Sequence, residues 1–364
     1  MRHSCCWLCL QAAGAFDGCT IGGDLILSAT PTLVAAGHAF AGLEVNGVLD
    51  LSANGWTSIS SLVLANVTVG ALDLGANPIA SIDTDAFLGF RSHSSLDLSG
   101  LGIQAVSLGA FRGMHVATHL LLSDNAMTVL PGTSAETATV ARVLASAASA
   151  PAACRSAFCG AQVGGTLDVA GTPFTALGTG WFDGLVAGQV DIGSPPRVTT
   201  VESAAFRGLT LGGSCLVSLA SQPVASLAPG TFTGVLCEDP GLLPTVDLSG
   251  TAFTVLGPAS MPHGLGGGAG DTSVLHLARI VLSGLPDLVE IAGPGVFTGL
   301  TVGTIEVTHC TSLARLGPAA FSGATITGNL DVSHNPSLAS LDARALDGVH
   351  VVGTLDLRNN IALA

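Results

Sequence analysis

Acidic side chains recur at one position of a short motif along much of the chain. Each lies between two apolar residues, as in Leu-Asp-Leu, so an alternating strand would bury both neighbours and leave the carboxylate in water. Stacked strands would bring such carboxylates about 5 Å apart, where each pair repels by roughly 0.8 kcal/mol before screening by salt. That repulsion requires no counter-ion. The nine positions are Asp50, Asp73, Asp97, Asp168, Asp191, Asp247, Glu306, Asp331 and Asp356.

Two interpretations of these nine carboxylates remain open. One is an acidic ladder that is only solvated. The other is a binding face whose summed field attracts a cationic ligand or a basic protein. His309 and His334 occur at the same phase of adjacent repeats, and they could add a metal-binding or pH-sensitive pair beside Glu306 and Asp331. We nevertheless expect no resident metal ion.

The nine cysteines favour an oxidising compartment. Two pairs fall within single repeats, Cys154 with Cys159 and Cys215 with Cys237. Each pair could form a disulfide, but spacing alone does not establish the geometry. The remaining N-terminal cysteines are Cys5, Cys6, Cys9 and Cys19.

Cys310 stands apart from the other cysteines because it follows a strand motif at a core position. A small apolar side chain fits there, which predicts a buried free thiol without reactivity. The segment "CCWLC" has no second cysteine pair at the spacing of a zinc site.

Motifs of enzymatic chemistry do not occur in this sequence. There is no Gly-rich phosphate loop that opens a helix with a Lys, and no His-Glu-x-x-His. The run "GGGAG" is followed by "DTSV", which continues no strand-turn-helix pattern. We therefore expect a protein that is not an enzyme and binds no cofactor.

Composition restricts the class of partner. The chain has 364 residues, of which 48% are hydrophobic and 10% charged, so it can bury a large core. Its net charge of −14 opposes binding to nucleic acid or to anionic membrane surfaces. It also contains no run of 18 apolar, uncharged residues, and we expect no membrane span.

The carboxylate motif belongs to a repeat whose strand starts lie 23 to 25 residues apart over most of the chain. A second column has the same period, because a Phe follows most of the starts by about 15 to 17 residues, and a Gly usually follows two places later. The strand starts are Leu25, Leu49, Leu72, Leu96, Leu120, Leu167, Val190, Val217, Val246, Ile280, Ile305, Leu330 and Leu355. The column of Phe comprises Phe40, Phe87, Phe111, Phe158, Phe182, Phe206, Phe232, Phe297 and Phe321.

Each repeat supplies one layer of a shared core. The short strand is too small to be stable alone, and the Phe and a Leu or Ile about 10 residues after the start complete its apolar layer. Because no layer can cover its own apolar face, neighbouring repeats must stack. Stacking places the strands in one parallel ladder, about 4.8 Å apart.

The repeat resembles the leucine-rich repeat of extracellular animal-type receptors, such as Toll-like and Slit-like proteins. "LDLGANPIASIDTDAFLGF" and "LDVSHNPSLASLDARALDGV" carry the resemblance best. It implies an α/β repeat solenoid, a curved horseshoe with a parallel β-ladder on the concave face and mostly irregular or 3-10 segments on the convex face. It also implies a binding surface without chemistry of its own.

The Asn column of this family is incomplete in the present sequence. Asn is retained at Asn54, Asn77, Asn125, Asn335 and Asn360. Other residues occupy the position elsewhere, namely Thr30, Leu101, Thr172, Pro195, Gln222 and Thr251, with Cys310 in a further repeat. We expect local irregularity at these places.

Two regions and the ends depart from the period. Residues 134–166 are interpreted as a degenerate repeat, with a helical insertion as the alternative. Residues 262–274 are interpreted as a Gly-rich surface loop, either a tolerated insertion or a binding loop. Residues 1–14 form an N-terminal segment, a signal peptide or cap remnant, and 15–364 form a solenoid of about 14 repeats. Both ends interrupt a repeat, which suggests a fragment of a longer protein.

The single sequon begins at Asn66. Asn66 is either a glycosylation site of a secreted protein or a substitute for the Gly that follows the Phe column, because Asn tolerates a left-handed turn.

Together these features predict a non-catalytic recognition or adhesion module. It would belong to a secreted protein or receptor ectodomain and bind a protein ligand, with a basic surface as the favoured chemistry. The alternatives are a cytoplasmic scaffold or regulator of the same fold, and the repeat part of a larger enzyme-linked receptor.

Overall fold

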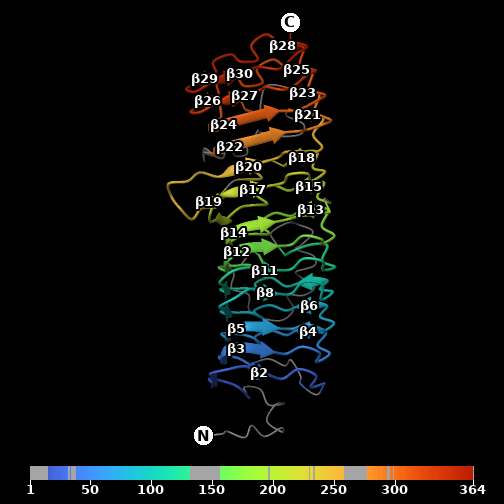
Figure 1. Ribbon diagram of the computed structural model, residues 1–364, viewed down its shortest axis with the longest axis vertical. Helices are drawn as coiled ribbons and strands as arrows, with labels where there is room; N and C mark the ends of the chain where they lie inside the picture. The colour runs from blue at the N-terminus through green and yellow to red at the C-terminus, as the bar shows by residue number, and fades with distance from the viewer. Residues whose placement is uncertain are drawn as a thin grey trace. The chain divides into compact units, whose positions relative to one another are not determined.

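The computed structural model consists of strands and turns. It describes residues 15–31, 33, 38–131, 156–195, 197–228, 230–232, 234–257, 277–292, 296–297 and 299–363. The chain forms two compact units. Unit 1 comprises Met1–Phe174 and Gly180–Pro195, and unit 2 comprises Thr175–Thr179 and Pro196–Ala364. In both units the chain winds in stacked circuits, each called a rung below, and equivalent strands pair in parallel (Figure 1).

The front ladder holds the strand motifs found in the sequence. In unit 1 it runs through β2 (Leu25–Ile26), β3 (Glu44–Asp50), β5 (Thr68–Asp73), β8 (Leu96–Asp97), β11 (Leu120–Leu121), β12 (Gln162–Asp168) and β14 (Val186–Asp191). In unit 2 it runs through β17 (Leu216–Ser218), β20 (Thr245–Asp247), β22 (Leu277–Ser283), β24 (Thr301–Thr308), β27 (Leu330–Asp331) and β30 (Leu355–Asp356). All thirteen predicted strand starts lie in these strands, so the stacked parallel ladder is confirmed.

A side ladder lies just before the front ladder in each rung. It uses the first residues of the longer strands β3, β5, β12, β14, β22 and β24, and separate two-residue strands elsewhere. These are β1 (Thr20–Ile21), β7 (Arg91–Ser92) and β10 (His115–Val116) in unit 1, and β16 (Thr210–Leu211), β19 (Leu236–Cys237), β26 (Thr325–Ile326) and β29 (His350–Val351) in unit 2.

A back ladder pairs the strands that follow each front strand by about ten residues. In unit 1 it contains β4 (Ser58–Ile59), β6 (Ser81–Ile82) and β9 (Ala105–Val106). In unit 2 it contains β13 (Ala176–Leu177), β15 (Thr200–Val201) and β18 (Ser226–Leu227), and separately β21 (Val255–Leu256), β23 (Glu290–Ile291), β25 (Arg315–Leu316) and β28 (Ser340–Leu341).

The back ladder corrects one expectation. Where the family resemblance implied irregular or 3-10 segments, the described residues contain parallel strands and turns and no helix. The physical reason is that the backbone N–H and C=O groups of adjacent rungs also lie side by side in the back ladder, where they form hydrogen bonds. Ser81 and Ile82, for example, pair with Ala105 and Val106. Each unit is therefore a β-solenoid, and helices contribute nothing to its described part.

Left-handed residues mark the corners of each rung. One corner lies four residues after every strand start except Val190, with φ between 51° and 68°. The residues there are Ala29, Ala53, Ala76, Gly100, Asp124 and Gly171 in unit 1, and Ser221, Gly250, Gly284, His309, His334 and Asn359 in unit 2. A further corner is the Gly that follows the Phe column, as at Gly42 and Gly89. These corners explain the high Gly content.

A second set of glycines is needed for close approach of neighbouring rungs. Gly70 precedes the motif Ala-Leu-Asp, and a Cβ there would lie 2.5 Å from the carbonyl oxygen of Asn46 and 2.7 Å from that of Gly47. A Cβ at Gly328 would lie 2.7 Å from the carbonyl oxygen of Gly303. This contact explains why Gly repeatedly comes shortly before the front motif.

The Phe column is confirmed as a stack through the core. All nine Phe side chains are buried. The ring centroids of Phe87 and Phe111 lie 5.4 Å apart, those of Phe111 and Phe158 lie 5.5 Å apart, and those of Phe297 and Phe321 lie 4.8 Å apart. The corresponding interplanar angles are 27°, 9° and 4°. Each ring thus fills one layer and covers the ring of its neighbour.

The Asn column satisfies buried backbone groups between rungs. The side chain Oδ1 of Asn77 accepts hydrogen bonds from the backbone N of Asn54 and of Trp56, at 2.9 and 3.1 Å. Its Nδ2 donates to the carbonyl oxygens of Leu51 and Leu74. Where Thr replaces Asn, the hydrogen bond to the carbonyl oxygen three residues earlier is retained. Thr251 Oγ1, for example, donates to Leu248 O at 2.7 Å.

The two long intervals of the sequence are bridged directly in the front ladder. Leu120 pairs with Leu167, and Val246 pairs with Ile280. No strand from residues between Leu120 and Leu167 therefore lies between β11 and β12. The interpretation of the first interval as a degenerate repeat, or as a helical insertion, remains a prediction. Residues 134–155 of that segment and the Gly-rich residues 262–274 lie outside the described residues, as do residues 1–14.

Candidate functional site

The front ladder holds all nine carboxylates, but it does not align them in one unbroken row. Asp50 pairs in register with Asp73, and Asp168 with Asp191. In unit 2, Glu306, Asp331 and Asp356 occupy the same position on consecutive strands. Leu121 stands between Asp97 and Asp168, and Val281 stands between Asp247 and Glu306.

Most of these carboxylates also have a local structural role that the sequence interpretation missed. Their Oδ1 accepts a hydrogen bond from the backbone N two residues later, which closes the turn at the end of the front strand. Asp97 accepts from Ser99 N at 2.9 Å and from Ser99 Oγ at 2.6 Å. The same backbone contact occurs at Asp50, Asp73, Asp168, Asp247, Asp331 and Asp356. The recurring Asp-x-Ser spacing was the signal available in the sequence.

These turn contacts favour the charged carboxylate. Burial opposes ionisation of Asp50, but hydrogen bonds from Ser52 and Ser28 outweigh it and hold the pKa of Asp50 below its ordinary value. Asp50 therefore carries negative charge under ordinary conditions.

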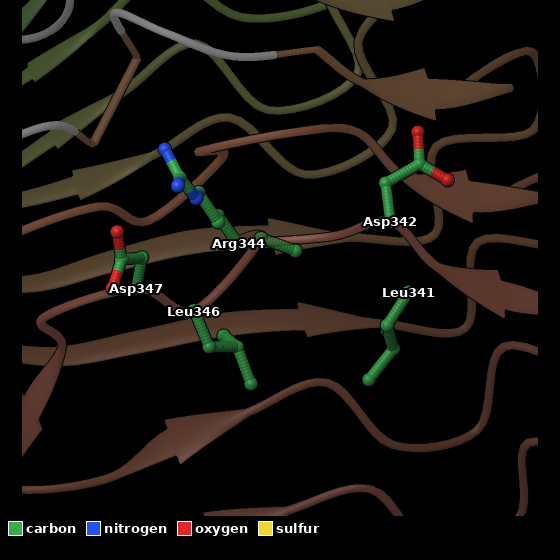
Figure 2. A pocket seen from close by; sticks show the side chains of 6 residues that line it. Leu341, Asp342, Arg344, Leu346 and Asp347 are labelled. Atoms are coloured by element: carbon green, nitrogen blue, oxygen red, sulfur yellow. The ribbon is translucent and has the colours of Figure 1, made fainter.

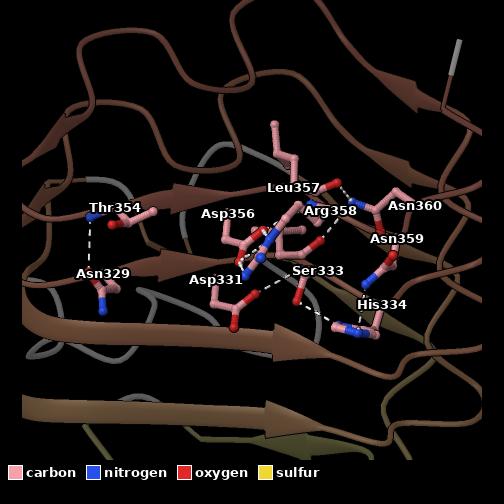
Figure 3. A network of polar contacts seen from close by, with 11 residues as sticks. Asn329, Asp331, Ser333, His334, Thr354, Asp356, Leu357, Arg358, Asn359 and Asn360 are labelled. Atoms are coloured by element: carbon pink, nitrogen blue, oxygen red, sulfur yellow. Dashed lines mark hydrogen bonds and ion pairs between the residues drawn. The ribbon is translucent and has the colours of Figure 1, made fainter.

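In unit 2, arginine side chains form ion pairs with two of the front-ladder carboxylates. Arg279 Nε lies 2.7 Å from Glu306 Oε1, and Arg358 Nη2 lies 2.6 Å from Asp356 Oδ2 (Figure 3). Hydrogen bonds from the Arg358 side chain lower the pKa of Asp356 to about 2. By contrast, none of the described basic side chains pairs with Asp73 or Asp97.

Asp73 and Asp97 line one shallow pocket of unit 1 together with Leu72, Gly75, Ser99 and Leu101. Both carboxylates are exposed. We call the five carboxylates of the unit 1 front ladder the acidic row; they are Asp50, Asp73, Asp97, Asp168 and Asp191.

A second pocket lies beside β28 in unit 2. Figure 2 shows Arg344 between the carboxylates of Asp342 and Asp347, with Leu341 and Leu346 along the pocket. Charges of both signs line it, so it defines neither a cation site nor an anion site.

The two predicted histidines lie together at a left-handed corner. The rings of His309 and His334 stack with centroids 4.9 Å apart and an interplanar angle of 10°. His334 uses both ring nitrogens, because Nδ1 lies 2.9 Å from Ser333 Oγ and Nε2 lies 2.8 Å from Asn359 Nδ2 (Figure 3). Within the described ranges, no group of three or more His, Cys, Asp or Glu residues could hold a metal ion.

Asn66 takes the place that the sequence suggested for it at a corner. Its φ is 55°, its side chain is exposed, and its backbone N donates to Leu88 O at 2.7 Å. It thus replaces the Gly of neighbouring rungs. Glycosylation at this exposed position remains a prediction.

The cysteines divide into bonded and free groups. Cys215 and Cys237 form a disulfide, as their spacing suggested, with Cα atoms 5.5 Å apart. Cys159 is disulfide-bonded. Cys19 and Cys310 are free thiols. The other cysteines, Cys5, Cys6, Cys9 and Cys154, lie outside the described residues.

Cys310 gives the molecule a defined alkaline sensitivity. Burial raises the pKa of its thiol to about 11, from an ordinary value of 9.0. The unfolded chain loses this proton first, so stability that is complete below pH 9 is lost as pH rises toward 11. The sequence contains no Lys and no Tyr that would titrate in the same range.

We expect urea unfolding to lose about 1 kcal/mol more between pH 8 and pH 10 in the natural protein than in Cys310→Ser, which cannot ionise there. Identical pH dependence of the two proteins would show that the native thiol ionises as readily as the unfolded one.

Comparison with known proteins adds no family assignment. No known family model matches the chain, and no curated protein is similar to it in sequence. No helix that is long and apolar enough to cross a membrane occurs in the part of the chain that the structure describes.

Proposed function

We propose that this chain is a non-catalytic recognition module of the leucine-rich-repeat kind, which binds a protein ligand with a basic surface through its acidic row. The proposal rests chiefly on the exposure of Asp73 and Asp97 and on their lack of a described basic partner. Both are exposed on neighbouring front strands, and no described basic side chain pairs with them. The repeated motif Leu-x-Leu-x-x-Asn supports the family named here.

Charge gives this surface its selectivity. The whole chain carries a net charge of −14, so long-range attraction favours basic partners and disfavours acidic ones. At short range, Oδ1 of each turn-forming Asp accepts its local hydrogen bond while the second carboxylate oxygen can meet a cation. Electrostatic recognition of this type strengthens at low salt and fades within a Debye length of about 8 Å at physiological ionic strength.

The acidic row can be neutralised without removing the turn contacts. Asn retains an oxygen that accepts the backbone hydrogen bond, so Asp73→Asn, Asp97→Asn and Asp168→Asn together should leave the fold intact. By calorimetric titration with an oligolysine peptide, we expect this triple variant to bind about tenfold more weakly at low salt.

The matched control removes three charges away from the acidic row, with Asp17→Asn, Asp287→Asn and Asp347→Asn. All three residues are exposed. The control should bind oligolysine nearly as well as the natural protein. If the two triple variants lose affinity equally, net charge rather than the acidic row governs binding and the proposed site is wrong.

We further propose that the module works outside the cell, in a secreted protein or receptor ectodomain. The Cys215–Cys237 disulfide supports this placement, because such bonds persist mainly in oxidising compartments. The exposed sequon at Asn66 is compatible with it. The alternatives are a cytoplasmic scaffold, which would keep these thiols reduced, and the repeat part of a larger enzyme-linked receptor.

A further inference from the structure

One rung of unit 2 contains an extended loop whose ends are joined to the same residue. Val217 and Val246 lie 29 residues apart, and the added length lies between β19 and β20. Figure 1 shows this segment projecting to one side of the stacked rungs of its unit. We call Leu236–Pro244 the stapled loop.

Cys215 fixes both ends of the stapled loop. Its sulfur forms the disulfide with Cys237, and its carbonyl oxygen accepts a hydrogen bond from Thr245 N at 2.9 Å. The Cys215 side chain is buried within the rung, so it anchors the loop to the core. Near Cys237, Glu238 N donates to Leu211 O at 2.8 Å.

The interior of the loop is also constrained. Asp239 Oδ1 accepts from Gly241 N at 2.8 Å, and Asp239 O accepts from Leu242 N at 3.0 Å. Pro240 and Pro244 further restrict the backbone. A loop held in this way loses little conformational entropy when a partner binds it.

The stapled loop exposes apolar side chains that the core does not use. Leu236, Leu242 and Leu243 are 58%, 43% and 46% exposed. Beside them, Glu238 and Asp239 are exposed carboxylates, and residues 231–245 contain no Lys, Arg or His. Exposed apolar side chains together with carboxylates on one fixed loop are typical of an interaction surface.

We infer that the stapled loop is a docking element that inserts its leucines into an apolar pocket of a partner protein whose rim carries Lys or Arg. The leucines supply the buried area, and the two carboxylates select the basic rim. The disulfide holds both in place. This surface belongs to unit 2 and acts independently of the acidic row in unit 1.

The test uses a displayed library of small three-helix proteins randomised on one face, selected on the natural protein without bias. Unbiased selection favours preorganised apolar anchors, since a few such residues supply most of the binding energy. Each selected clone is then titrated against Leu242→Ser/Leu243→Ser. Both side chains are exposed, so this variant should keep the natural melting midpoint and circular dichroism.

We expect most clones to bind the double variant at least about tenfold more weakly and to be enriched in Lys and Arg. Val289→Ser, which removes an equally exposed apolar side chain elsewhere in unit 2, and the acidic-row triple variant should bind these clones normally. Removing the disulfide with Cys215→Ser/Cys237→Ser should weaken binding of these clones about threefold or more, because the loop is then less constrained.

Three results would overturn the inference. Clones that do not distinguish the double variant would show that the loop is not a preferred surface. Loop-dependent clones without enrichment in basic residues would refute the proposed rim. Leucine-dependent dimerisation in light scattering, or leucine-dependent binding to phosphatidylcholine vesicles, would assign the loop to a second copy or to lipid.

Discussion

Phe111→Ala should lower the free energy of unfolding of unit 1 by about 3 to 5 kcal/mol, the range found when a buried Phe is truncated to Ala. Phe111 is fully buried and stacks between Phe87 and Phe158. Its removal opens a cavity that the neighbouring rungs cannot close, because their spacing is fixed by the ladders. Urea unfolding followed by circular dichroism measures the change.

Phe111→Leu provides the matched control, because it retains most of the apolar volume. We expect its loss to be less than half of that of the Ala variant. An unfolding midpoint of Phe111→Ala equal to that of the natural protein would show that the Phe column does not fill the core layers.

Asn77→Ala should destabilise unit 1 by about 2 to 5 kcal/mol, because each buried backbone group left without a partner costs about 1 to 3 kcal/mol. The substitution leaves the backbone N of Asn54 and of Trp56 without their acceptor. It also removes the donor to Leu74 O. The same urea measurement applies.

Two further substitutions separate this effect from simple truncation. Asn77→Thr should lose less, since Thr at the equivalent position still donates to the carbonyl three residues earlier, as Thr172 does to Val169 O. Asn46→Ala, at an exposed position, should change stability by less than about 0.5 kcal/mol. Equal midpoints for Asn46→Ala and Asn77→Ala would refute the structural role of the Asn column.

The front ladder and the core were predictable because the strand-start residues are buried in every front strand except β2 and β30, and all nine Phe are buried. Leu49 and Leu72 pair in register, and the Phe rings stack, so one residue type is required at one spacing throughout. Such a requirement appears directly as a period in the sequence. The spacing of Cys215 and Cys237 allowed the disulfide that they form, but spacing alone did not establish it.

The back ladder was not predictable from the sequence pattern. Its strands contain two residues each, such as Ser81–Ile82, which is too short for an alternation of apolar and polar side chains. The parallel pairing there depends on the backbone of the next rung. The family resemblance therefore implied irregular segments where the structure has strands.

The sequence pattern also did not predict that the acidic residues both face solvent and accept hydrogen bonds that close a turn. Leu-Asp-Leu identifies the wet face of a strand, but the turn contact of Asp97 with Ser99 becomes evident only when the backbone direction after the strand is known. The break of the row at Leu121 depends on the direct pairing of Leu120 with Leu167, which skips 46 intervening residues. Strand register across a long insertion is set by stacking in three dimensions.

The claim that unites fold and proposed function is that this solenoid is a recognition surface that works outside the cell. The most direct test is mass spectrometry of the protein secreted from a eukaryotic host, with and without reduction, reading the occupancy of Asn66 in the same spectrum. If the protein works outside the cell, we expect a Cys215–Cys237 linked peptide, free Cys310 and a glycan on Asn66. Nine free thiols with an unmodified Asn66, or no secretion, would contradict it and favour the cytoplasmic scaffold.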